Sequence, residues 1–174
     1  MRGITGKSVI ITGAGRRRGL GEGIARRFVE EGANVLIADL DRPSGEQFPE
    51  HGVPAASEME QVVAELRGAG PGRVEAITCD VRSEEQVASV VDRAVAEFGG
   101  VDVLVNNAGI GYLMSPIIDT DLANWQVVLD VNLTGTFLAT KYTGRQMVAQ
   151  GRGGRIINIS SQGGKSGFPH AGAY

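Results

Sequence analysis

The chain has 174 residues, of which 42% are hydrophobic and 26 are glycine, and its formal net charge at pH 7 is −3. This length suits one domain, over residues 1–174, and the apolar fraction excludes a disordered chain. The glycines follow no three-residue period, which excludes a collagen-like protein. The mildly acidic charge argues against nucleic acid or a membrane surface as a general partner.

Cysteine usage and the N-terminal sequence bear on the compartment. Cys79 is the single cysteine, so no internal disulfide can form and the fold does not require an oxidising compartment. No window approaches the roughly 18 apolar residues of a membrane span, and the first residues do not resemble a leader. We therefore expect a cytoplasmic protein that does not insert into a membrane.

Short runs rich in valine and isoleucine alternate with helical patterns along the chain. Such runs are typical of strands that are buried on both faces of a parallel sheet. They occupy residues 8–11, 34–38, 74–78, 101–105 and 155–159. The alternation predicts an α/β fold with a doubly wound parallel sheet and right-handed crossovers, as in the Rossmann fold.

Helices are predicted between these strands, over about residues 21–31, 57–68, 83–98 and 121–149. Ser57 and Ser83 each precede Glu or Gln by three residues, which predicts a capping box at the start of the second and third helices. Residues 41–56 contain three prolines and two glycines, and this composition predicts an irregular segment.

The turn after the first strand is the first candidate site. It runs from Thr12 to Gly21, is rich in glycine and opens a helix, so its N–H groups can approach a diphosphate at the helix N-terminus. Asp39 ends the second strand at close to the roughly 20-residue spacing at which an acid binds an adenosine ribose. A carboxylate there accepts hydrogen bonds from both ribose hydroxyls and repels a 2′-phosphate, which favours NAD over NADP.

Other interpretations of these residues stay open. A glycine-rich turn can be only a tight turn, and Asp39 can be a loop carboxylate that caps a nearby group. One guanidinium of Arg16, Arg17 and Arg18 can instead bind a 2′-phosphate, which makes NADP the alternative cofactor. The triplet can equally be a solvated run of charge.

These motifs resemble the short-chain dehydrogenase/reductase family from the first strand to the last residue. The family's glycine motif is matched by Thr12, Gly13, Gly19 and Gly21 if two extra residues are allowed within the arginine triplet. The resemblance implies that the cofactor is held by Gly13, Gly15, Gly19, Leu20, Gly21, Asp39, Asp80, Val81, Asn107, Ala108 and Gly109.

Two of these segments follow later strands. Asp80 and Val81 come after the third strand and resemble the family's contact with the adenine. Residues 106–109, Asn-Asn-Ala-Gly, come after the fourth strand and are similar to the family signature that stabilises the central sheet and forms a wall of the cofactor site.

The resemblance also assigns catalytic roles. Tyr174 would transfer the proton, Ser161 would orient the substrate by a hydrogen bond, and Asn132 would hold a water of the proton relay. The family's spacing between serine and tyrosine selects Ser161 over Ser160. Without the resemblance, either hydroxyl can simply bond to a neighbouring backbone amide.

The family places a lysine four residues after the tyrosine, and this chain ends at Tyr174. The lysine matters because a phenol, with an ordinary pKa near 10, is a poor base at neutral pH without a nearby positive charge. We therefore expect the chain as written to be a poor catalyst and to be the N-terminal part of a longer enzyme, without the C-terminal strands and helices.

The substrate is harder to predict. An apolar wall after the fourth strand can contact substrate or, alternatively, pack against the long helix; it comprises Tyr112, Leu113, Met114, Ile117 and Ile118. His51 and His170 are too isolated to suggest a metal site, so we expect no metal.

Three functions follow from these observations. The first is an NAD(P)-dependent oxidoreductase that interconverts a small-molecule alcohol and a ketone or aldehyde. The second is a noncatalytic dinucleotide-binding or sensing module. The third, a nucleic-acid contact through residues 16–18, is disfavoured by the acidic net charge. The family resemblance further implies a homo-oligomer for the full-length protein.

Overall fold

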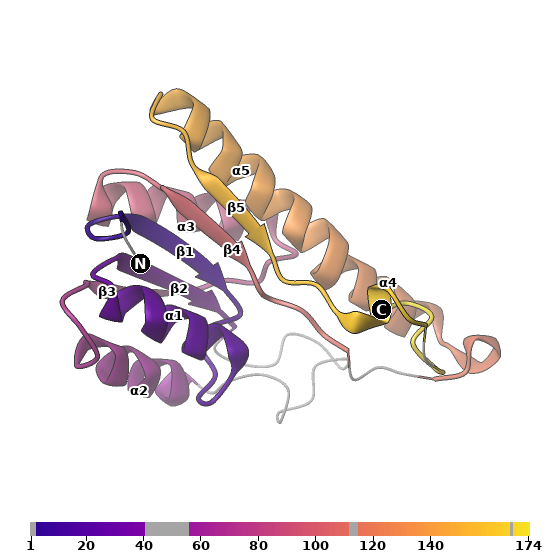
Figure 1. The fold of residues 1–174 in the computed structure, drawn as a ribbon. Helices are drawn as coiled ribbons and strands as arrows, with labels where there is room; N and C mark the ends of the chain where they lie inside the picture. The colour runs from indigo at the N-terminus through magenta and orange to yellow at the C-terminus, as the bar shows by residue number, and fades with distance from the viewer. Residues whose placement is uncertain (1–2, 41–55, 112–114, 168) are drawn as a thin grey trace.

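A computed structural model describes residues 3–40, 56–111, 115–167 and 169–174. Five parallel strands form one sheet in the order β3-β2-β1-β4-β5 (Figure 1). The strands are β1 (Ser8–Thr12), β2 (Asn34–Asp39), β3 (Val74–Thr78), β4 (Val103–Asn106) and β5 (Arg155–Asn158). The order reverses between β1 and β4, and open α/β sheets bind ligands at the carboxyl ends of the strands at such a point. The predicted doubly wound sheet is confirmed.

Helices cover both faces of the sheet (Figure 1). On one face, α1 (Leu20–Glu30) and α2 (Ala56–Arg67) pack in one apolar cluster with Val9 and Ile11. On the other, α3 (Glu84–Phe98) and α5 (Thr136–Ala149) pack in a second cluster with Ile10. Successive strand residues point to opposite faces, so one continuous apolar run serves both clusters.

The two predicted capping boxes differ from the structure. The side chain of Ser83 caps α3 by accepting the N–H of Gln86 at 3.3 Å, but the Gln86 side chain accepts the N–H of Asp80 at 2.8 Å instead of that of Ser83. α2 begins at Ala56, so Ser57 lies in the first turn rather than at the cap. Alanine extends a helix at the lowest cost of any residue, which explains the earlier start. The rest of the predicted irregular segment, residues 41–55, lies outside the described residues.

The long predicted helix over residues 121–149 has a change of winding in its middle. It consists of α4 (Leu122–Leu129), a π-helical segment (Asp130–Gly135) and then α5, with helical backbone at both junctions. A Cβ atom on Gly135 would lie 2.7 Å from Cγ2 of Val81, so this glycine lets the helix approach the loop after β3. π-Helical turns within α-helices are frequent at functional sites.

β5 is an exposed edge strand of the sheet. All four residues of β5 are exposed, and Ile157 is 42% exposed. On α5, which runs beside β5 in Figure 1, Phe137 and Val148 are also exposed. Within the described ranges, no helix is both long enough and apolar enough to cross a membrane.

Candidate functional site

The glycine loop between β1 and α1 packs directly against the end of β4. Gly13 has φ +67° and donates its N–H to the carbonyl of Ala38 at 2.7 Å. A Cβ atom on Gly13 would lie 2.7 Å from Cα of Ala108, and one on Gly21 would collide with the carbonyl oxygen of Gly13. These close approaches require glycine, and they place the N-terminus of α1 at the carboxyl edge of the sheet.

Side-chain amides of the segment after β4 fix this loop. Nδ2 of Asn107 donates to the carbonyl oxygens of Thr12 at 2.9 Å and Gly13 at 2.7 Å. In return, Oγ1 of Thr12 accepts the N–H groups of Asn107 and Ala108, each at 3.1 Å. The neighbouring Asn106 donates to Asn158 at 2.8 Å and so ties β4 to β5.

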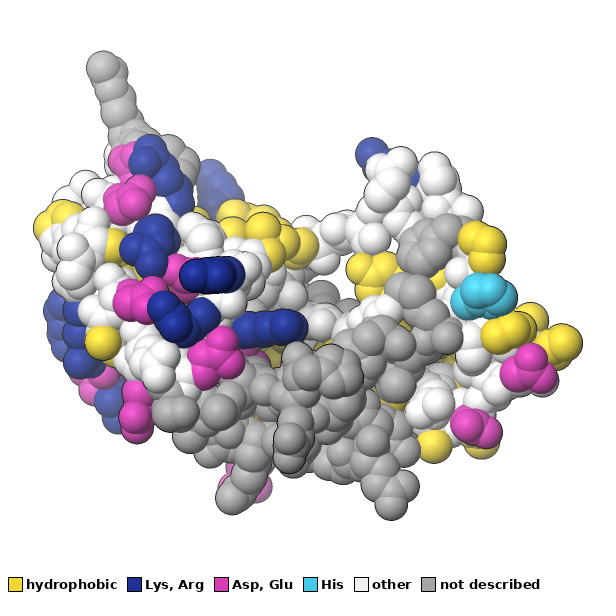
Figure 2. Space-filling view, turned by 90° about the horizontal axis from the view of Figure 1, so that it is seen from below, with side chains coloured by type: hydrophobic (Ala, Val, Ile, Leu, Met, Phe, Trp, Pro, Cys, Tyr) yellow, Lys and Arg dark blue, Asp and Glu magenta, His cyan; other side chains and the backbone are white. Residues whose placement is uncertain are grey.

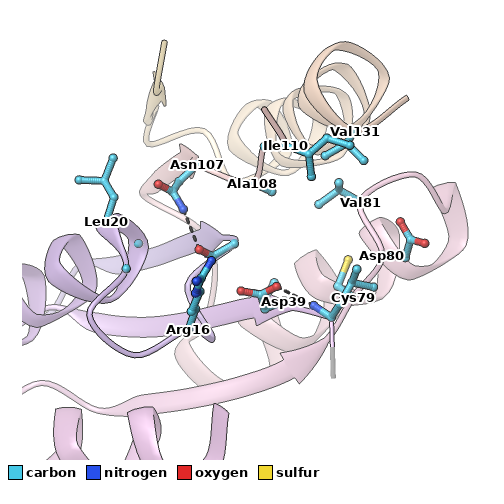
Figure 3. A pocket seen from close by; sticks show the side chains of 16 residues that line it. Arg16, Leu20, Asp39, Cys79, Asp80, Val81, Asn107, Ala108, Ile110 and Val131 are labelled. Carbon is cyan, nitrogen blue, oxygen red and sulfur yellow. Dashed lines mark hydrogen bonds between the residues drawn. The ribbon is translucent and has the colours of Figure 1, made fainter. Parts of the chain in front are cut away.

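A cavity of about 240 Å³ opens at the carboxyl ends of β1, β2 and β4 (Figure 3). Every predicted cofactor-binding residue except Gly15 lines it: Gly13, Gly19, Leu20, Gly21, Asp39, Asp80, Val81, Asn107, Ala108 and Gly109. The apolar side chains of Val81, Ile110 and Val131 gather on one side, and Asp39 and Arg16 lie across from them (Figure 3). Val131 precedes Asn132 in its motif and Ile110 follows the Asn-Asn-Ala-Gly signature, but the sequence assigned neither side chain a role.

Asp39 both lines this cavity and caps the glycine loop. Its Oδ2 accepts the N–H of Gly15 at 2.7 Å, and its Oδ1 accepts the N–H of Leu40 at 2.8 Å. Burial raises the pKa of Asp39 to about 6 in spite of these two hydrogen bonds, with a further increase from Glu58 and a decrease from Arg16. Each carboxylate oxygen has a second lone pair, so the group can still accept hydrogen bonds from a ligand.

Gly15, which does not line the cavity, acts through Asp39. A Cβ atom on Gly15 would lie 2.9 Å from Cβ of Asp39, so the absence of a side chain permits the hydrogen bond between them. Gly15 thus supports the acid that lines the site, and its predicted contact with the cofactor stays a prediction.

The three arginines of the loop have different surroundings. Arg16 lines the cavity. Arg17 forms an ion pair with Glu65 at 2.7 Å, and its N–H donates to Glu58. Arg18 has φ +58° and donates its N–H to Glu22 at 2.9 Å. Arg16 is thus the arginine that lies at the cavity, and the alternative that one guanidinium binds a 2′-phosphate stays open.

Asp80 and Cys79 lie at the far side of the same cavity. The Asp80 carboxylate is held by Arg82, whose Nε lies 2.9 Å from Oδ1. Burial raises the pKa of the Cys79 thiol to about 12, with smaller contributions from the charges of Asp80 and Asp39. Cys79 is therefore a neutral thiol in the wall of the cavity, and not a nucleophile.

A second cavity, of about 640 Å³, adjoins the first. The two share the residues Leu20, Asn107, Ala108, Gly109 and Ile110. The second cavity is also lined by Asn132, Ser161 and Tyr174, the three predicted catalytic residues. The structure therefore brings together residues from three separate segments beside the glycine loop, and the paired cavities suit an extended ligand.

Asn132 lies in the π-helical segment and is bonded to the chain after β4. Its Nδ2 donates to the carbonyl oxygen of Ile110, and its Oδ1 accepts the N–H of Ile110, both at 2.9 Å. Thr136 donates its hydroxyl to the carbonyl oxygen of Asn132 at 2.9 Å. These bonds fix the main chain between the two cavities, and the predicted water-holding role remains a prediction.

Ser161 and Tyr174 reach the second cavity from the C-terminal part of the chain. Oγ of Ser161 accepts the N–H of Gly163 at 3.1 Å, the backbone bond that the alternative interpretation predicted. Ser160 lines the cavity as well. The ring of Tyr174, 48% exposed, packs on Gly111, where a Cβ atom would lie 3.1 Å from the ring.

The proposed apolar wall is only partly described. Ile117 and Ile118 are 62% and 88% exposed in a short 3₁₀ turn, so neither of these two is buried against the long helix. Ile117 lines a cavity of about 360 Å³ together with His170 and Tyr174. Tyr112, Leu113 and Met114 lie outside the described residues. In the part of the chain that the structure describes, no three His, Cys, Asp or Glu side chains gather as metal ligands would.

The sheet order, the glycine loop and the cavity at the strand reversal define a Rossmann-type nucleotide-binding fold. The family model described as short chain dehydrogenase matches residues 7–174. The chain belongs to the short-chain dehydrogenase/reductase family.

Three similar proteins illustrate this membership. The 2,5-dichloro-2,5-cyclohexadiene-1,4-diol dehydrogenase of Sphingobium indicum is 34% identical over 174 residues, which is 100% of this chain and 62% of the relative. The crystal structure of NAD⁺-bound xylitol dehydrogenase matches with a TM-score of 0.85 and 33% identity, over 99% of this chain and 60% of that one. Carveol dehydrogenase from Mycobacterium avium in complex with NAD matches with a TM-score of 0.88 and 31% identity, over 98% and 60%. The chain thus spans about three fifths of the length of these proteins.

Proposed function

We propose that the whole protein is an NAD-dependent oxidoreductase that interconverts a small-molecule alcohol and a ketone or aldehyde. One observation carries this proposal: the cavity with the glycine loop and Asp39 adjoins the cavity that contains Asn132, Ser161 and Tyr174. A dehydrogenase needs a cofactor and a proton-transferring group side by side. The names of the relatives and the NAD in two structural neighbours support it.

The cofactor would be held by the loop and by the end of β2. A Cβ atom on Gly13 or Gly21 would collide with backbone, so both positions must be glycine for the loop to keep the shape that would offer its N–H groups to a diphosphate. The first N–H groups of a helix have no intrahelical partner, and Gly19 offers no side-chain cap to those of α1. Asp39 would accept the adenosine ribose hydroxyls, and Val81 and Ile110 would contact the adenine. Bound NAD would supply hydride acceptance and donation.

Two hydroxyl groups of the chain would hydrogen-bond the substrate oxygen, and one of them would transfer its proton. The phenol of Tyr174 would take a proton from an alcohol or give one to a carbonyl, and Oγ of Ser161 would hydrogen-bond the same oxygen. Asn132 would hold the main chain at Ile110, so that the wall between cofactor and substrate stays fixed. Ser161 and Tyr174 line one cavity, which supports these roles.

A noncatalytic dinucleotide-binding module is the second candidate. It is favoured by two observations at the proposed catalytic groups: Oγ of Ser161 already accepts a backbone N–H, and Tyr174 is half exposed. In this case the glycine loop and Asp39 would keep their role, and the second cavity would transfer no proton.

The two candidates are separated by turnover. The protein encoded by the complete reading frame is incubated with NAD⁺ and a panel of secondary alcohols and polyols, and formation of reduced nicotinamide is followed by its absorbance. The enzyme proposal predicts turnover that Tyr174→Phe and Ser161→Ala abolish without weakening NAD⁺ binding. Tyr142→Phe is the matched control, because Tyr142 bonds to Glu84 on α3, away from both cavities. NAD⁺ binding without turnover of any substrate supports the module, and absence of NAD⁺ binding contradicts both.

The compartment, the partners and the choice between NAD and NADP are proposals as well. The single cysteine and the net charge of −3 support a cytoplasmic protein. Arg17 pairs with an acidic side chain, which leaves less positive charge for nucleic acid and supports its absence as a partner. The proposal that the protein does not associate with membranes rests on its composition. The proposal that it assembles into a homo-oligomer rests on the family resemblance. NADP remains the alternative cofactor.

A further inference from the structure

A carboxylate on α2 holds the glycine loop where the loop is longer than the family's motif. Oε1 of Glu58 accepts the N–H of Arg17 at 2.9 Å, across 41 positions of sequence. Two turns further along α2, Oε1 of Glu65 pairs with the guanidinium of Arg17 at 2.7 Å. Residues seven apart share a face of a helix, so α2 presents both acids to the loop.

The same loop is bound to α1 through a second acid. The exposed Arg18 donates its N–H to Glu22, and Glu22 pairs with Arg26 at 2.6 Å. Arg26 also lies 3.7 Å from Glu65, which joins the contacts of α1 and α2. Figure 2, which views the side of α1 and α2, shows blue and magenta side chains interleaved over this part of the molecule. The positive charges of Arg17 and Arg26 are therefore balanced by neighbouring carboxylates.

Charged groups of both signs also lie at the side of the first cavity that contains Asp39. Arg16 and Asp39 line it, and Glu58 is close enough that its charge raises the pKa of Asp39. The hydrogen bond from the loop to Glu58 comes from a neutral N–H and leaves the carboxylate charge in place. Two acids and one arginine thus lie at or near this part of the cavity, and Glu58 is held there by its 2.9 Å hydrogen bond to the loop.

We propose that Glu58 is a specificity-determining residue that acts through the loop and through Asp39, so that the site accepts NAD and rejects the 2′-phosphate of NADP. This inference rests on the proposed function. Its carboxylate has two separable effects: the oxygen that accepts the N–H of Arg17 positions the loop, and the negative charge repels a phosphate at the adenosine ribose. Glu58 contacts neither cavity directly, so it is a positioning residue and not a catalytic one.

Two substitutions separate these effects. Glu58→Gln keeps an oxygen that can accept the N–H of Arg17 and removes the charge, whereas Glu58→Ala removes both. Glu60→Gln, at an exposed position of the same helix, is the matched control for the loss of one negative charge from α2. Dissociation constants for NAD⁺ and NADP⁺ are measured by calorimetry on the purified protein at low salt and at about 1 M salt, where the Debye length falls to about 3 Å.

Glu58→Gln is expected to bind NADP⁺ about fivefold more tightly than the unsubstituted protein, with NAD⁺ changed by less than about twofold, and the gain should shrink in high salt. Glu58→Ala should in addition weaken NAD⁺ binding, because the loop loses an anchor. A ratio of NADP⁺ to NAD⁺ affinity in Glu58→Gln equal to that in Glu60→Gln would overturn the inference while leaving the proposed function intact. If the unsubstituted protein binds neither dinucleotide, the proposed function is itself refuted.

Discussion

Replacement of Asp39 by asparagine tests whether a carboxylate is held at the cavity at an energetic cost. The pKa of Asp39 is raised from 3.8 to about 6, chiefly by burial. Between about pH 4 and pH 6 the folded chain therefore binds more protons at this site than the unfolded chain, and its stability falls as the pH rises through that range. Below pH 4 the group is protonated in both states, and above pH 6 it is charged in both.

The magnitude follows from the pKa shift. About two pKa units at 1.36 kcal/mol each give a cost of about 3 kcal/mol at neutral pH that is absent at pH 4. Asparagine does not ionise and escapes this cost, although its NH₂ group cannot accept the N–H of Leu40 as Oδ1 of Asp39 does. That lost hydrogen bond costs about 1 kcal/mol at every pH. Asp39→Asn should therefore be slightly less stable than the parent at pH 4 and about 2 kcal/mol more stable at pH 7.5.

The assay is urea unfolding of the cofactor-free protein, followed by circular dichroism at several values between pH 4 and pH 7.5. Asp92→Asn, at an exposed position of α3, is the matched control for the loss of one carboxylate. The stabilities of Asp39→Asn and the parent must diverge as the pH rises. A difference that is constant over this range would show that Asp39 carries no burial cost, and the electrostatic description of the cavity would be wrong.

Three further predictions concern other parts of the site. Gly13→Ala should lower the free energy of unfolding by about 2–4 kcal/mol in urea titrations, because it adds left-handed backbone strain and a 2.7 Å contact with Ala108. The control Gly23→Ala, with nothing within 4 Å of the added Cβ atom, should be neutral or stabilising. Equal effects of the two substitutions would contradict the close packing at Gly13. Asn132→Asp removes the donor to Ile110 and should lower the melting temperature and turnover together, and unchanged turnover would deny Asn132 its positioning role. Cys79 should react with maleimide at pH 8 only after denaturant is added, because it is buried and its pKa is raised to about 12; fast labelling of the folded protein would refute this.

The sequence predicted those features that depend on neighbouring residues. Continuous apolar runs such as residues 34–38 identified the strands, and the glycine spacing after Thr12 identified the loop. Gly13 and Gly21 were predicted from this spacing, whereas the close approach of Gly13 to Ala108 that requires a glycine is seen only in the structure. The order and spacing of short motifs then placed the candidate residues around adjoining cavities.

Features that depend on distant contacts were not predictable. The π-helical segment at Asn132 accompanies hydrogen bonds to Ile110, 22 positions away, and no local sequence pattern predicts it. The sequence left open that Asp39 caps a nearby group, but its partner, the N–H of Gly15, depends on how the loop folds back over β2. Likewise, the hydrogen bond between Glu58 and the N–H of Arg17 joins residues 41 positions apart, and only the structure shows how α2 packs against the loop.

The central claim is that the glycine loop and Asp39 form a dinucleotide site next to the hydroxyls of Ser161 and Tyr174. A crystal structure of the protein soaked with NAD⁺ tests it most directly. The account predicts the diphosphate at the N-terminus of α1 and both adenosine ribose hydroxyls within about 3.2 Å of the Asp39 carboxylate. A diphosphate bound elsewhere, or a ribose that does not contact Asp39, would contradict it.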